Sequence, residues 1–106
     1  MKRKRIYVSI PITGLDYETQ VLRAAGIRKY LSHFYDEVVI PFENGVPVDA
    51  HPSVHMRADF KLLLDCDAIY MVSGWEDSSG CVAEFQVARH CHMDIKYESL
   101  KSMYYR

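Results

Sequence analysis

The sequence lacks the motifs of several common classes of enzyme. It contains no GxGxxG pattern, no Walker sequence and no nucleophile elbow for a Ser-His-Asp site. These absences argue against a nicotinamide cofactor, a P-loop and a serine hydrolase, and we expect no cofactor. No apolar run approaches ~18 residues and no signal peptide precedes the first expected strand, so we expect a soluble, cytoplasmic protein without membrane contact.

The sequence also has no marked excess of positive or of negative charge. The formal net charge is −1, which gives no general attraction to nucleic acid or to an acidic membrane. The one basic run, KRKR at residues 2–5, is expected to be a solvated terminus rather than a nucleic-acid tag. We therefore expect no nucleic-acid polymer among the partners of this protein.

Cysteine and histidine do not form a recognisable metal motif. Three cysteines without a CxxC pair fit a reducing compartment better than a disulfide framework. His90, Cys91 and His92 are consecutive, and successive helical residues point ~100° apart, so they cannot chelate one ion. His51 and His55 are four residues apart but lack an acidic partner at ligand spacing. We expect no metal site.

Length and composition set the size of the protein. The chain has 106 residues and 49% apolar content, which is enough for one core and one domain, residues 1–106. It is short for an enzyme that must close a pocket alone. We therefore expect a homodimer or a higher homo-oligomer, in which a second subunit supplies part of the pocket wall.

Apolar runs and helical periodicities alternate along the chain. Strands are expected at 5–10, 37–41, 68–72 and 95–97, and helices at 16–35, at 54–65, from Ser79 onward and, as a last turn, at 99–104. This alternation predicts an α/β protein, a three-layer α/β/α flavodoxin-like (Rossmann-like) fold with a parallel sheet of about four to five strands. In such sheets, binding sites gather at the carboxyl ends of the strands.

Glu84 is the residue on which the functional prediction depends. If Ser79 is the N-cap, Glu84 lies in the second helical turn, and it shares the apolar face with Gly80, Ala83, Val87, Ala88 and Cys91. An ionised carboxylate facing a core costs several kcal/mol unless it is paired or used. We therefore expect Glu84 in the crevice between strand and helix, although a solvated glutamate or a rotated helix remains an alternative.

Other polar groups are expected near the same crevice. Asp59 lies at the edge of a helical stripe whose inward residues are predicted to be Met56, Phe60, Leu63 and Leu64. Tyr7, on the first strand, is close enough to reach the crevice. Two carboxylates and a few hydroxyls suit glycosyl chemistry, in which one carboxylate attacks the anomeric carbon and the other manages a proton.

Two loops offer candidate substrate contacts. Backbone N–H groups of the first loop could hold a phosphate or a sugar, and its residues are Pro11, Ile12, Thr13 and Gly14. Ser78 and Gly80, at the start of the last long helix, are further candidates. Trp75 and Tyr70 offer flat surfaces for a base, although simple packing is the commoner role of such residues.

Two sequence motifs resemble a known family. IYVSIPITG at 6–14 and MRADFKLLLDCDAIYMVSGWEDSSGCVAE at 56–84 resemble the nucleoside 2-deoxyribosyltransferase-like superfamily. Within it, the pattern CDAIYMVSGWEDSSG is similar to that of a short group that is largely of unknown function. The resemblance covers roughly residues 5–97.

The resemblance implies roles for four residues. Glu84 matches the nucleophile that attacks C1' of the sugar, and Tyr7 matches the tyrosine that positions it. Asp59 is similar to an aspartate near the leaving base. In relatives that hydrolyse nucleoside monophosphates, a serine at the position of Ser78 holds the 5'-phosphate.

We therefore expect a nucleoside or nucleotide N-glycosidase or deoxyribosyltransferase-like protein, with a small-molecule nucleoside or nucleotide as its partner. One alternative is a regulatory module that binds a nucleotide or nucleoside without turnover. Thr13, which stands where the phosphate-binding relatives carry an arginine, and the lack of the transferases' C-terminal asparagine motif favour this alternative. A third interpretation, a purely structural subunit, requires Glu84 to be exposed to solvent.

Overall fold

Strands and helices alternate along the computed structural model, which describes residues 3–99. The strands are β1 (Arg5–Ser9), β2 (Glu37–Val39), β3 (Ala68–Met71) and β4 (Asp94–Tyr97). The α-helices are α1 (Tyr17–Leu31), α2 (Pro52–Leu64) and α3 (Ser79–His90). Two short 3-10 helices, η1 (Pro41–Glu43) and η2 (Trp75–Asp77), follow β2 and β3. The predicted α/β class is confirmed.

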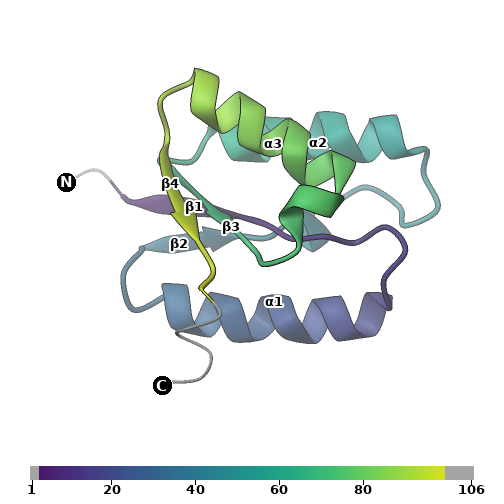
Figure 1. Cartoon of the computed structure of the whole chain (residues 1–106), viewed down its shortest axis with the longest axis horizontal. Coiled ribbons are helices and arrows are strands. Elements are labelled where there is room, and N and C mark those ends of the chain that lie inside the picture. Colours follow the sequence, from purple (N-terminus) through teal and green to yellow (C-terminus); the bar gives the residue numbers. More distant parts are fainter. Residues whose placement is uncertain (1–2, 100–106) are drawn as a thin grey trace.

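The four strands form one parallel sheet in the order β2-β1-β3-β4. Helix α1 covers one face of the sheet, and α2 and α3 cover the other (Figure 1). The predicted three-layer flavodoxin-like arrangement is confirmed. The chain leaves β1 toward β2 on one side and returns to β3 on the other, so a crevice is expected beyond the carboxyl ends of these strands.

Strand residues alternate between two cores. Ile6 and Val8 of β1 pack in the cluster beneath α1, whereas Tyr7 packs in the cluster on the side of α2 and α3. Because successive strand residues point to opposite faces, Ser9 lies on the same side as Tyr7. The sheet thereby directs two hydroxyl groups of β1 toward α3.

Helix α1 begins where predicted and ends earlier. The Asp16 carboxylate accepts the backbone N–H of Thr19 at 3.0 Å and caps the helix start. The helix ends at Leu31 rather than at residue 35. Its buried stripe includes Gln20, whose amide donates to the Pro11 carbonyl at 2.7 Å. Three large apolar residues of the expected helix at 16–35 are exposed: Tyr17, Val21 and Phe34.

Helix α2 turns most of the predicted face inward, and Leu64 is the exception. It begins at Pro52 rather than at residue 54, and its buried residues are Asp59 and Leu63. Leu64, which was predicted to point inward, is 57% exposed, whereas Leu63 is fully buried. One residue is a rotation of ~100°, so Leu64 lies off the face on which Leu63 is buried.

Helix α3 starts one residue earlier than predicted. Ser78, not Ser79, is the N-cap, and its Oγ accepts the backbone N–H of Cys81 at 3.3 Å. Glu84 nevertheless lies in the second turn. Three residues that lie outside the predicted apolar face are exposed: Gln86, Arg89 and His92. Cys91, which was expected on the apolar face, is exposed because it follows the last helical residue.

Two further expectations from the sequence concern a last helical turn near the C-terminus and the absence of membrane-spanning segments. The last helical turn expected at 99–104 lies outside the described residues, apart from Ser99. Within residues 3–99, no helix combines the length and the apolar character needed to cross a membrane.

The adjacent leucines of α2 provide a test of this packing. Leu63→Ala should lower the free energy of unfolding by about 3 kcal/mol, because it leaves a cavity in a packed core. Leu64→Ala is the matched control and should change it by no more than about 0.5 kcal/mol. Urea denaturation of both variants measures the difference, and equal losses would mean that α2 is rotated from the position described.

Candidate active site

A cavity of about 350 Å³ opens beyond the carboxyl ends of β1 and β2. Its walls come from the loops after these strands, from α2 and from the first turns of α3. Its polar lining residues include Thr13, Asn44, His55, Asp59, Ser78, Ser79 and Glu84. The cavity therefore brings the two predicted carboxylates to one site.

Glu84 is held by two hydroxyl groups of β1. The Tyr7 hydroxyl donates a hydrogen bond to Oε2, and the Ser9 hydroxyl donates to Oε1 at 2.7 Å. The glutamate is 4% exposed and lines the cavity. The prediction that Glu84 faces inward is confirmed, and the solvent-exposed alternative is wrong.

Burial dominates the titration of this cluster. It raises the pKa of Glu84 to about 7, although the hydrogen bonds from Tyr7 and Ser9 oppose this shift. The negative charge of Asp59 raises the pKa of Glu84 further. Burial, followed by the charge of Glu84, raises the pKa of Tyr7 well above its usual value, so the phenol stays a neutral donor. Near neutral pH, Glu84 is thus present in both charge states.

Asp59 supplies a second carboxyl group in the cavity. It is 7% exposed, and the Asn44 side chain donates a hydrogen bond from Nδ2 to Oδ1 at 2.8 Å. Burial raises the pKa of Asp59, while the Asn44 hydrogen bond and the electrostatic interaction with His55 lower it. The aspartate predicted at the edge of its helix is therefore inside the site.

The predicted first loop contributes only in part. Ile12 and Thr13 line the cavity. Pro11 is buried beside it with its carbonyl bonded to Gln20, and Gly14 is exposed with φ of +81°, where it supplies a turn. At the start of α3, the predicted Ser78 and Gly80 both line the cavity.

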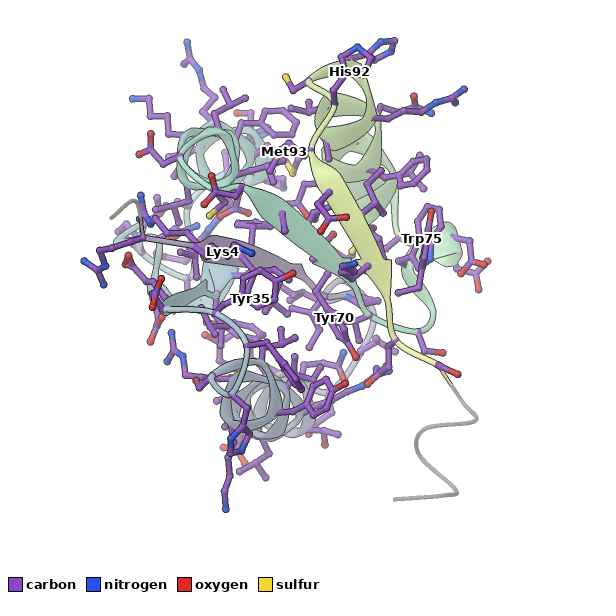
Figure 2. The ribbon with its side chains drawn as sticks, turned by 90° about the vertical axis from the view of Figure 1, so that its left-hand side faces the viewer. Lys4, Tyr35, Tyr70, Trp75, His92 and Met93 are labelled. Carbon is purple, nitrogen blue, oxygen red and sulfur yellow. The ribbon has the colours of Figure 1, made fainter. Side chains whose placement is uncertain are left out.

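The aromatic residues at the cavity differ from those expected. Figure 2 shows Tyr70 on the α1 side of the sheet and Trp75 beside β4. The Trp75 ring lies 4.7 Å from that of Phe85, between ring centroids, and it does not line the cavity. The aromatic rings that line it belong to Tyr17 and Phe42, which contact each other edge to face at 5.1 Å.

Three polar residues of the site were assigned no role in it from the sequence. Ser9 follows Tyr7 by two positions on β1, and this period of two could have identified it as a second partner of Glu84. Asn44 and His55 come from a loop and from the first turn of α2, and only the folded chain brings them together. Within residues 3–99, no three side chains of His, Cys, Asp or Glu are placed to share a metal ion.

The fold and the site together define a parallel α/β protein with a buried, hydrogen-bonded glutamate at the floor of a cavity. The chain matches the family described as Domain of unknown function (DUF4406) over residues 4–97, and it belongs to this family. No curated protein matches the chain.

The raised pKa of Glu84 predicts how stability depends on pH. The folded state holds this proton up to pH of about 7, whereas an ordinary glutamate loses it near 4.5. The protonated Glu84 therefore contributes to the free energy of unfolding in full below pH ~4.5. This contribution, on the order of 3 kcal/mol in total, is lost as pH rises through about 7. Glu84→Gln should remove this loss, so the variant should gain stability over the wild type between pH 4.5 and 8.

Denaturant titrations across this pH range measure the difference. Glu76→Gln, at an exposed glutamate of η2, is the matched control and should follow the wild type. If the free energy of unfolding changed with pH in the same way in the wild type and in Glu84→Gln, the result would contradict the raised pKa of Glu84.

Proposed function

We propose that this protein cleaves the N-glycosidic bond of a nucleoside or nucleotide, with Glu84 as the nucleophile at the anomeric carbon. The observation that carries this proposal is the Glu84 carboxylate, which is buried, held by two hydroxyls and directed into a cavity that also contains Asp59. The resemblance of the two sequence motifs to nucleoside 2-deoxyribosyltransferase-like proteins supports the same reaction.

The reaction proceeds in two displacements. The Glu84 carboxylate forms a bond to C1' while the C1'–N bond breaks, and the electron pair of that bond leaves with the base. A proton passes from Asp59 to the base, directly or through water. Water then attacks C1', returns a proton to Asp59 and releases the Glu84 carboxylate. A second base in place of water would give transfer rather than hydrolysis.

The neighbours of Glu84 suit this role. The hydroxyls of Tyr7 and Ser9 donate to opposite oxygens of the carboxylate, which fixes its plane and leaves further lone pairs for attack. Because attack requires the ionised form, activity should rise with pH through about 7, the pKa of Glu84. Burial raises the pKa of Asp59, so this acid keeps its proton to higher pH than an exposed aspartate.

The substrate contacts are assigned to the walls of the cavity. Ser78 and Gly80 at the start of α3, together with Thr13, face the sugar or its 5' substituent, where helix N-terminal N–H groups favour an anion. Tyr17 and Phe42 offer the apolar surface for a base that was first expected from Trp75 and Tyr70.

A panel of deoxynucleosides and their monophosphates tests the proposed cleavage, with free base as the product measured. The competing function is binding without turnover. In that case a ligand raises the melting temperature by an amount that grows with the logarithm of its concentration over Kd, and the ligand is recovered intact. Base release from none of the panel, at high protein concentration, would contradict the cleavage.

Glu84→Gln should reduce turnover by roughly a hundredfold or more, because it removes the charge that attacks C1' and stabilises its developing positive charge. Glu76→Gln, at an exposed position, should keep normal turnover. Mass spectrometry with a 2-fluoro-substituted nucleoside should find the trapped sugar on Glu84. An adduct on another residue, or normal turnover of Glu84→Gln, would overturn the mechanism.

Asp59→Asn should slow the release of poor leaving groups more than that of good ones, because an asparagine cannot supply the proton. Rates for a series of nucleosides that differ in the acidity of the base measure this dependence. Asp65→Asn, at the exposed end of α2, is the matched control. An equal loss for all leaving groups would mean that Asp59 has a structural role only.

A further inference from the structure

Asn44, His55 and Asp59 form a hydrogen-bonded cluster in the cavity wall. The proposed reaction assigns a role to Asp59 and none to the other two. All three side chains line the cavity, although Asn44 lies after β2 and the other two lie on α2. His55 and Asp59 are four residues apart, so they share one face of that helix.

The orientation of the Asn44 amide follows from its partners. Its Oδ1 accepts the backbone N–H of Val46 at 2.9 Å. A backbone N–H can only donate, so the amide oxygen must be on this side. The amide nitrogen Nδ2 then faces Asp59 Oδ1 at 2.8 Å and His55 Nδ1 at 3.2 Å. An amide nitrogen has two hydrogens to donate and accepts none, and both are used here.

This orientation fixes the tautomer of His55. Because Asn44 donates to Nδ1, that ring nitrogen must present a lone pair, and the ring proton must reside on Nε2. The His55 side chain forms no other hydrogen bond with the described residues, so its Nε2–H group is available to a molecule in the cavity.

We propose that His55 is the hydrogen-bond donor for a ring nitrogen of the base, and that Asn44 is the residue that positions it. This inference rests on the proposed function. A ring nitrogen of the base gains electron density as the glycosidic bond breaks. The hydrogen bond from His55 therefore strengthens in the transition state and assists both recognition and departure of the base.

The tautomer can be tested without any ligand. In the ¹⁵N-labelled protein, the histidine nitrogen shifts should show that His55 is protonated at Nε2, and Asn44→Leu should shift His55 toward a mixture of the two tautomers. A wild-type protein with His55 protonated at Nδ1 would overturn the inference.

The recognition can be tested with base analogues in the Glu84→Gln background, where binding is measured without cleavage. The probes are 2'-deoxyadenosine and its 1-deaza, 3-deaza and 7-deaza analogues, each of which replaces one ring nitrogen by C–H. 2'-Deoxycytidine and its 3-deaza analogue test a pyrimidine in the same way. One analogue should bind about 10- to 100-fold more weakly than its parent, because it leaves the His55 donor unpaired.

In the same background, His55→Phe should bind the parent and that analogue equally, and the control His90→Phe, at an exposed residue of α3, should keep the difference. His55→Gln, whose amide can donate a hydrogen bond, should restore part of the difference between the parent and the analogue. The inference would be overturned if all analogues bound equally, or if His55→Phe still bound the one analogue more weakly than its parent. It would also be overturned if neither parent bound at millimolar concentration.

These outcomes are distinct from those of the proposed cleavage. Analogue discrimination without base release by the wild type would remove the cleavage and keep the His55 contact. Base release without discrimination among analogues would remove the His55 contact and keep the cleavage.

Discussion

The desolvation of one carboxylate is the constraint on which the site depends. An ionised glutamate inside a core costs several kcal/mol, and Glu84 is tolerated because two hydroxyls of β1 donate to its oxygens. The compensation is incomplete, since the pKa of Glu84 remains raised to about 7. A fold that only needed packing would place an apolar residue here. The buried carboxylate, next to a cavity, has the position and the charge that the proposed attack on an electrophilic carbon would use.

The parallel sheet makes this arrangement geometrically simple. Tyr7 and Ser9 project from the same face of β1 because they are two residues apart, and α3 packs over that face. The Ser78 cap sets where α3 begins, and this start places Glu84 one turn further along the buried side. Glu84 and both of its hydrogen-bond partners therefore lie on regular elements, which hold side chains more rigidly than loops do.

Loops and α2 complete the opposite part of the site. Asn44 joins the loop after β2 to α2 by its bonds to Asp59 and His55. One amide thus holds a carboxylate and an imidazole side by side and determines where the imidazole carries its proton. An apolar part of the cavity wall comes from Tyr17 and Phe42, which pack against each other.

The sequence by itself determined the α/β class, the parallel sheet, the cap of α1 and the inward direction of Glu84. These features depend on local periodicity and on capping residues, which a single chain segment displays. Only the tertiary structure decided that Ser9 shares Glu84 with Tyr7, that Leu64 faces solvent and that Trp75 packs against Phe85 outside the cavity. The Asn44 cluster is likewise a product of folding, because it joins two segments whose proximity depends on how the loop after β2 returns to α2. Periodicity shows which face of an element is apolar, but the partner of each polar side chain is set by long-range packing.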